Sequence, residues 1–243
     1  MQIRSLIVKN YFDQTDNYLK NNFGIASRSS LINRNLPELK NKIILDIGCG
    51  NGEVTLPYIE NNKITFLDLS DKMLDIVRSR IPEEYHQNAE FVNIDLDSFN
   101  YVKKYDYLFL IGVLAHVNSV EMTISKVSQL LDCDGTLIIQ FTNSNNIISL
   151  IVKLLGEIKK MFGKSLNYKV NSNSFRVIRK ELRKNKLEYF KKVNYWPSLP
   201  GFSLIPNRVR GFVQSKILNS KLIQPLGGEI LLFVSNVRNN MQT

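Results

Sequence analysis

From residue 42 to residue 141, apolar runs alternate with amphipathic patterns. The nearly continuous apolar runs predict five strands, KIILDIG, KITFLDL, AEFVNIDL, YDYLFLIG and GTLIIQFTN. The patterns between them predict helices over EVTLPYIEN, SDKMLDIVRSRI and VEMTISKVSQLL, the second with Ser70 or Asp71 as its N-cap. Strands this apolar are typical of a parallel sheet covered on both faces. The alternation therefore predicts a doubly wound α/β fold with right-handed crossovers.

The flanking segments predict additional elements around this core. Before it, NYFDQTDNYLKNNF and SRSSLINRNLPEL predict helices that form a lid over the carboxyl edge of the sheet. After it come an apolar helix (NIISLIVKLLGEIKKMF), a basic helix (NSFRVIRKELRKN), a sixth strand (KLEYFKKVNYW) and a closing strand (GGEILLFVSNV). We expect one domain over 1–243, with a lid at 1–41, a core at 42–145, and a substrate cap with the closing strands at 146–243.

Composition narrows the class of protein. The 243 residues are 44% hydrophobic, which is ample for a packed core. We find no signal peptide and no run of about 18 apolar residues, which predicts no membrane span. Cys49 and Cys133 suggest neither a disulfide framework nor a zinc site, and no metal is expected. These features favour a cytoplasmic setting.

The net charge of +10 is unevenly distributed along the chain. Residues 1–152 hold 14 Lys and Arg against 18 Asp and Glu, whereas residues 153–243 hold 18 against 4. A basic half of this size attracts acidic partners such as phosphate-bearing molecules, anionic lipid or nucleic acid. It is equally well explained as a solvated surface that keeps the protein dispersed.

The loop GCGNG follows the first predicted strand, where open α/β sheets bind ligands. Gly48 and Gly50 permit a tight turn and let backbone N–H groups approach a ligand closely. The spacing is G-x-G-x-G, with Glu53 where a dinucleotide site has its third glycine, and no P-loop lysine follows. The loop therefore favours a ligand with a positive group over a diphosphate.

Three acidic residues stand at the ends of three successive predicted strands. They are Asp46, Asp68 and Asp95. Asp68, 22 residues after Asp46, is placed to accept both hydroxyls of a ribose. Asp95 is placed to accept from an exocyclic amine of adenine, with Leu96 packed on the ring. A loop or N-cap role is the alternative for each acid taken alone.

Taken together, LDIGCGNG, FLDLSDKMLDIVRSR, FVNIDLDSF, YDYLFLIGVLAHV and LLDCDGTLIIQ resemble the successive motifs of class I S-adenosylmethionine-dependent methyltransferases. The resemblance covers roughly residues 42–141. It implies a seven-stranded sheet with strand seven reversed between strands five and six. It implies S-adenosyl-L-methionine as cofactor, with Asp46, Gly48 and Gly50 around its methionine part, Asp68 on the ribose, and Asp95 with Leu96 at the adenine.

The resemblance also implies further cofactor contacts within or near these motifs, Cys49, Leu69, Met73 and Ile111. Arg28, in the preceding helix, resembles residues that pair with the cofactor's carboxylate, although a surface role is equally open. The turn LLDCDGTL departs from the family's usual Pro-Gly-Gly, which affects only the shape of that loop.

An alcohol acceptor needs a general base, and histidine is the usual choice. His116 directly follows the fourth strand, at the edge that faces the transferable methyl, and is the first candidate as base or orienter; a packed structural histidine is the alternative. His86 lies in a polar turn and is expected to be solvated. Tyr11 and Tyr18 in the lid are weaker candidates, because such tyrosines more often serve packing.

The acceptor itself is less constrained. No Asn/Asp-Pro-Pro-aromatic tetrad follows strand four, which argues against methylation of base amines, and no RNA-binding module is recognised. Segments 146–173 and 197–227 are expected to roof a small-molecule pocket, with Tyr195, Trp196 and Phe202 as walls. The main hypothesis is methyl transfer to a hydroxyl, or to an amine, of a small-molecule or glycan-type metabolite.

Three alternatives stay open. The basic half favours a lipid-linked or an RNA acceptor, and the apolar helix 147–162 lies either on an anionic membrane surface, at the inner face of the membrane, or on the protein as a cap. A non-catalytic cofactor-binding protein is the third alternative. The pattern predicts no oligomeric state.

Overall fold

The computed structural model describes residues 3–13, 22–100, 102–143, 173–195, 205–219 and 227–237. Their centre is one seven-stranded sheet in the order β3-β2-β1-β4-β5-β7-β6. The strands are β1 (Ile43–Ile47), β2 (Lys63–Leu67), β3 (Ala89–Val92), β4 (Tyr105–Ile111), β5 (Leu131–Thr142), β6 (Leu187–Tyr195) and β7 (Glu229–Asn236). The neighbours from β3 to β5 pair in parallel, while β7 runs antiparallel between β5 and β6. The predicted fold class, including the reversed strand, is confirmed.

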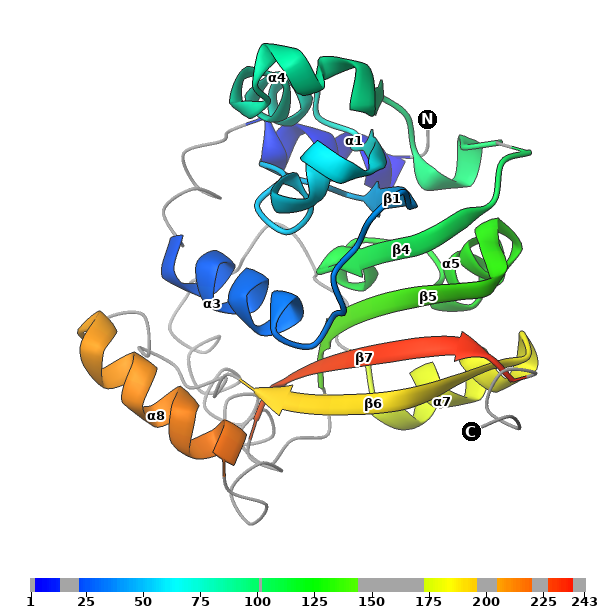
Figure 1. The fold of residues 1–243 in the computed structure, drawn as a ribbon. Coiled ribbons are helices and arrows are strands. Elements are labelled where there is room, and N and C mark those ends of the chain that lie inside the picture. Colours follow the sequence, from blue (N-terminus) through cyan, green and yellow to red (C-terminus); the bar gives the residue numbers. More distant parts are fainter. Residues whose placement is uncertain are drawn as a thin grey trace.

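Helices cover both faces of this sheet (Figure 1). They are α1 (Ile3–Phe12), α3 (Asn22–Asn33), α4 (Asp71–Arg80), α5 (Val120–Leu130), α7 (Phe175–Lys184) and α8 (Asn207–Asn219). Short 3₁₀ turns lie in the connections that follow β1, α4, β3 and β4. They are η1 (Leu56–Asn61), η2 (Glu83–Asn88), η3 (Leu96–Ser98) and η4 (Val113–Ala115). Serine caps begin α4, α5 and α7, because Ser70, Ser119 and Ser174 each accept from the N–H three residues on.

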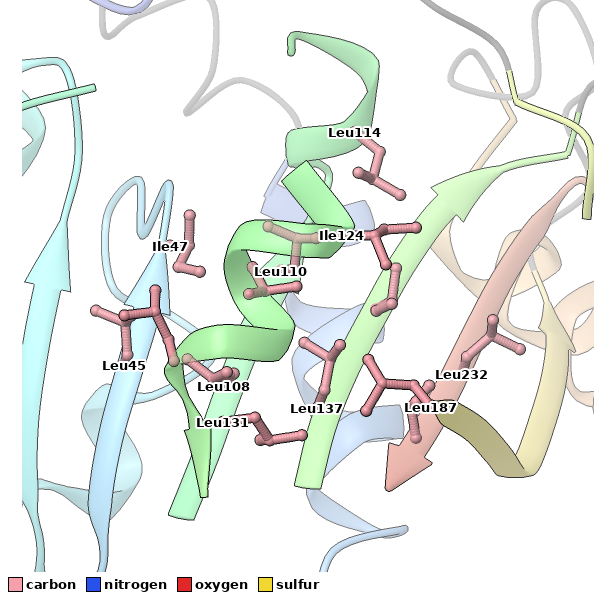
Figure 2. Packing of buried hydrophobic residues seen from close by; sticks show 14 of the residues in the cluster. Leu45, Ile47, Leu108, Leu110, Leu114, Ile124, Leu131, Leu137, Leu187 and Leu232 are labelled. Carbon is pink, nitrogen blue, oxygen red and sulfur yellow. The ribbon is translucent and has the colours of Figure 1, made fainter. Parts of the chain in front are cut away.

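Two hydrophobic clusters form the core, one on each face of the sheet. Their separation follows from the alternation of side chains along each strand, which places Leu108 and Leu110 of β4 in one cluster and Phe109 in the other. Ile124 of α5 and Ile178 of α7 belong to the first cluster, part of which Figure 2 shows between α5 and the strands. Both faces are thus buried, as the apolar strand pattern predicted.

The boundaries differ from the predicted ones mainly in the lid. Helix α1 begins at Ile3, before the predicted helix 10–23, most of which lies outside the described residues. The second predicted helix ends at Asn33 rather than at residue 39. Pro37 disfavours helical backbone in the residue before it, which is consistent with that earlier end. The predicted helix over 53–61 shortens to the 3₁₀ turn η1. The predicted apolar helix 147–162 lies outside the described residues, and none of the described helices has the length and apolarity to cross a bilayer.

Candidate active site

A cavity of ≈ 480 Å³ opens at the carboxyl edge of the parallel strands. Residues from the ends of β1, β2, β4 and β5 line it, together with the first residue of β7 and the last of β6. Helices α1 and α3 contribute the walls above this edge. Ligands of open α/β sheets bind at this edge, and the cavity is therefore the candidate site.

The glycine loop after β1 forms the floor of this cavity. Gly48 and Gly50 line it with φ of 63° and 55°, backbone angles that non-glycine residues rarely adopt. A Cβ at Gly48 would lie 2.7 Å from Val113 Cγ2, so the close approach requires glycine. The N–H groups expected to approach a ligand are instead donated to the end of β2: the N–H of Gly48 donates to Leu67 O (2.7 Å) and that of Gly50 to Asp68 Oδ2 (2.9 Å). The loop therefore presents bare glycine Cα faces to the cavity.

Asp68 lines the cavity at the end of β2, as predicted. Its two carboxylate oxygens accept from the N–H groups of Gly50 and Ser70, both at 2.9 Å. Burial raises the pKa of Asp68, and these backbone donors oppose that shift. The N–H of Leu69 also acts on this carboxylate. Because a carboxylate has about four lone-pair sites, acceptor capacity remains for a ligand hydroxyl.

Asp95 and Leu96 also line the cavity, where the chain leaves β3. Asp95 is the N-cap of η3, accepting from the N–H of Asp97 at 3.0 Å. It accepts from the hydroxyl of Ser5 on α1 as well. The N-cap alternative weighed for this acid is thus present, and it coexists with a position beside the cavity.

The remaining predicted cofactor residues separate into two groups. Leu69 and Ile111 line the cavity. Asp46, Cys49 and Met73 do not line it, being buried in the protein with exposures of 2%, 8% and 0%. These three support the loop and α4 from behind instead of facing the cavity.

Asp46 is a buried carboxyl held by one threonine. Its Oδ2 accepts from the hydroxyl of Thr55 at 2.6 Å. Burial raises the pKa of Asp46 to about 7, and the nearby Asp68 adds to this, whereas the Thr55 bond and Arg28 oppose it. This hydrogen bond joins the end of β1, where Asp46 lies, to the segment that leads into η1.

Helix α1 crosses the ends of β2, β3 and β4 and closes the cavity from above. The guanidinium of Arg4 donates to the carbonyls of His116 (3.0 Å) and Ala115 (3.3 Å). Farther along the helix, Lys9 Nζ donates to Leu69 O at 3.1 Å. Just past its end, Asp13 accepts from the hydroxyl of Ser70 at 2.6 Å. Tyr11 lines the cavity, while Tyr18 lies outside the described residues.

His116 lies in the cavity wall after β4, as predicted. Its ring meets that of Phe12 edge to face, with centroids 5.3 Å apart. Burial, and secondarily the positive charge of Arg4, lowers the pKa of His116 to about 4. The imidazole is therefore neutral at pH 7. His86 is exposed, as expected, with Nε2 2.9 Å from Ile81 O.

A polar group lies at the opposite end of the cavity from Asp95. Arg28, which was predicted, lines the cavity there, together with Gln140, Thr142 and Glu229, which the sequence analysis missed. Arg28 Nη1 is 3.4 Å from Gln140 Oε1 on β5, and Gln140 Nε2 donates to Glu229, the first residue of β7. Thr142 donates to the other oxygen of Glu229 at 2.9 Å. Tyr195 lines the cavity beside them, whereas Trp196 and Phe202 lie outside the described residues.

The rule that found the aspartates could have found part of this group. Gln140 and Thr142 are polar residues at the end of an apolar strand, the feature that singled out Asp68. Glu229 begins its strand instead of ending it. It reaches the same edge because β7 is antiparallel.

The central segment of the chain is similar in sequence to known methyltransferases. A sequence-family model described as a methyltransferase domain matches residues 45–137. Over 95 residues the chain is 28% identical to malonyl-[acyl-carrier protein] O-methyltransferase 1 of Ilyobacter polytropus, covering 38% of this chain and 35% of that protein. Over 99 residues it is 26% identical to a probable (S)-tetrahydroprotoberberine N-methyltransferase 2 of Papaver bracteatum, covering 40% and 28%. The chain thus spans about a third of the length of these curated relatives.

Among solved structures, the fold is similar to magnesium protoporphyrin IX methyltransferase from Synechocystis PCC 6803 with bound S-adenosylhomocysteine. The TM-score is 0.65 at 17% identity, over 96% of this chain and 99% of that one. At this identity the likeness concerns the fold, and it extends over nearly the whole of both chains.

Proposed function

We propose that the chain is a class I S-adenosylmethionine-dependent methyltransferase that transfers a methyl group from S-adenosylmethionine to a small-molecule acceptor. The match of residues 45–137 to a methyltransferase domain supports this proposal. The observation that carries the proposal is the single cavity in which the glycine loop and Asp68 meet His116 and the polar group around Glu229. The wall with the glycine loop and Asp68 would bind the cofactor, and the wall with His116 and Glu229 would bind an acceptor.

The cavity's residues fit this cofactor. Arg28 Nε is buried and has no hydrogen-bond partner in the described part of the chain, a need that a ligand carboxylate would satisfy. Gly48 and Gly50 leave room for close approach of the methionine part, and Asp68 keeps acceptor capacity for ribose hydroxyls. A volume of ≈ 480 Å³ is within the range of small-molecule sites.

The catalytic contribution of the chain is mainly alignment and exclusion of water. When bound, the cofactor supplies a methyl group made electrophilic by the positively charged sulfur. Helix α1, fastened by Arg4 and Lys9, covers the cavity. His116, neutral at pH 7 with a pKa of about 4, is a weak base; we assign it to orienting the acceptor by a hydrogen bond.

We propose a hydroxyl oxygen of a metabolite or glycan-type molecule as the acceptor atom, with an amine nitrogen as the alternative. The names of the two curated relatives represent both, one an O-methyltransferase and one an N-methyltransferase. The cavity of ≈ 480 Å³, with α1 across it, supports an acceptor of small-molecule size.

Calorimetry with S-adenosylhomocysteine tests the cofactor part. We expect binding by the wild type, at least tenfold weaker binding by Asp68→Ala, and affinity within twofold of wild type for Asp75→Ala, whose side chain is exposed on α4. Absence of binding by the wild type would overturn the proposal.

A donor-consumption screen tests the acceptor class. The protein is incubated with S-adenosylmethionine and separate pools of small metabolites, oligosaccharides, phospholipid vesicles and RNA. We expect consumption with the first or second pool. Consumption only with vesicles or RNA would show that the acceptor is a lipid or an RNA and not a small metabolite or glycan. Cofactor binding without consumption in any pool would indicate a non-catalytic protein.

A further inference from the structure

The order of strands divides the cavity into two halves. Asp95 and Asp68 follow β3 and β2, and the glycine loop follows β1. Beyond β4 the same edge continues over β5 and β7. Neighbouring strands lie about 4.8 Å apart, so Glu229 on β7 is roughly 10 Å from the end of β4 and farther still from the glycine loop. The residues after β5 and at the start of β7 thus lie on the side of the cavity away from Asp68.

Glu229 is the acidic side chain on that side of the cavity wall. Its backbone is paired in register with Thr142 on one side and Tyr195 on the other, which holds its position rigidly. Gln140 and Thr142 each donate to one of its oxygens. Gln140 is itself buried, with an exposure of 4%, and the cluster is therefore a built site and no mobile surface group.

The electrostatic balance of this cluster is incomplete once a cofactor is present. Arg28 is the cation that acts on Glu229, and its charge opposes the rise that burial causes in the pKa of Glu229. Under the proposed function, a cofactor carboxylate takes the free Nε of Arg28. Glu229 then still accepts from the neutral donors Gln140 and Thr142, but it shares the positive charge of Arg28 with the cofactor carboxylate. Buried carboxylates are stable when a full positive charge lies nearby.

We propose that Glu229, held by Gln140 and Thr142, is the acceptor-binding residue and selects acceptors that carry a protonated amine. This inference rests on the proposed function. The ammonium group restores the charge balance beside Glu229 and serves as a recognition group, since a protonated amine has no lone pair with which to accept a methyl group. The methylated atom is then a separate group of the same acceptor, held nearer the end of β4 and His116.

The test compares two probes of nearly the same shape, benzylamine and benzyl alcohol, with protein saturated with S-adenosylhomocysteine at pH 7.5. Affinities come from amide chemical-shift titrations of the wild type, Glu229→Gln and the exposed control Glu83→Gln. We expect wild type and Glu83→Gln to bind benzylamine at least fivefold more tightly than benzyl alcohol. In Glu229→Gln, again saturated with S-adenosylhomocysteine, we expect the preference to fall within twofold.

Two results would overturn the inference while leaving the proposed function intact: equal affinity of both probes for the cofactor-bound wild type, or a preference that persists in Glu229→Gln. If Glu229→Gln does not fold, the wild-type titration decides, because benzylamine must shift the amides of residues 140–142 and 229; shifts confined to other regions contradict the proposal. A wild type that does not bind S-adenosylhomocysteine overturns the proposed function and this inference together.

Discussion

The N–H of Gly50 donates a 2.9 Å hydrogen bond to Oδ2 of Asp68 and so joins the loop after β1 to the end of β2. The N–H of Ser70 binds the other oxygen of the same carboxylate at 2.9 Å. Asp68 therefore shapes the glycine loop and begins the turn into α4 while it faces the cavity. The residue expected to bind the cofactor's ribose also holds the loop that the cofactor would contact.

Replacement of Gly48 by alanine is expected to destabilise the protein. The new Cβ would lie 2.7 Å from Val113 Cγ2 at a backbone φ of 63°, so both overlap and backbone strain oppose it. We expect a loss of about 1–3 kcal/mol in the free energy of unfolding. Chemical denaturation measures it. Gly211→Ala is the matched control, because nothing lies within 4 Å of its added Cβ in α8, and a gain of about 0.5–1 kcal/mol is expected there. Equal effects of the two substitutions would contradict the conclusion that the position of Gly48 requires glycine.

Asp46→Asn is expected to change how stability depends on pH. Burial raises the pKa of Asp46 from 3.8 to about 7 in the folded protein, so the native state binds more protons than the unfolded state between these values. The free energy of unfolding of the wild type, relative to Asp46→Asn, should therefore fall as pH rises from 4 to 7. Denaturation at pH 5, 6 and 7 measures this difference. Asp75→Asn, the same substitution at an exposed site on α4, is measured alongside as the comparison.

His116 is expected to act in the opposite direction. Its pKa is lowered from 6.5 to about 4, so the unfolded state binds more protons between these values. The free energy of unfolding of the wild type, relative to His116→Gln, should rise as pH increases from 4 to 6.5 and stay level above. The two effects partly cancel in the wild type, which is why each needs its own variant. A flat difference for His116→Gln would show that the imidazole is solvated.

Arg4→Met is expected to loosen α1 over the cavity. The substitution removes two hydrogen bonds to the carbonyls of Ala115 and His116 and removes the positive charge beside His116. We expect faster amide hydrogen exchange in residues 3–13 and an upward shift in the pKa of His116, followed by NMR. Because burial is the larger cause of the lowered value, the shift should be partial. Lys180→Met on the exposed face of α7 serves as control. An unchanged pKa of His116 in Arg4→Met would show that the charge of Arg4 does not act on this imidazole.

Much of the site was predictable because its chemistry is local in sequence. Apolar strands of a parallel sheet end at one edge, so Asp68, Asp95 and the glycines after β1 were expected to meet there, and they line one cavity. A methyltransferase-domain model matches residues 45–137, the segment whose motifs implied this kind of family. Asp46 shows where this reasoning fails, because its position near a strand end did not reveal that it turns inward to Thr55.

The sequence by itself determined the parallel strands and the polar residues at the ends of β1 to β3, because strand periodicity and glycine geometry act over a few residues. The reversed strand was implied by the resemblance to a family and not by periodicity. Only the tertiary structure brought Arg28, Gln140, Thr142 and Glu229 together, since they come from α3, β5 and β7, and Glu229 reaches the cavity through the antiparallel course of β7. It also decided the protonation of His116, because burial and the Arg4 charge depend on how α1 packs against a residue that lies 112 positions after Arg4 in the sequence. The burial and the charge around these residues depend on contacts between segments far apart in the sequence, and a local pattern does not predict such contacts.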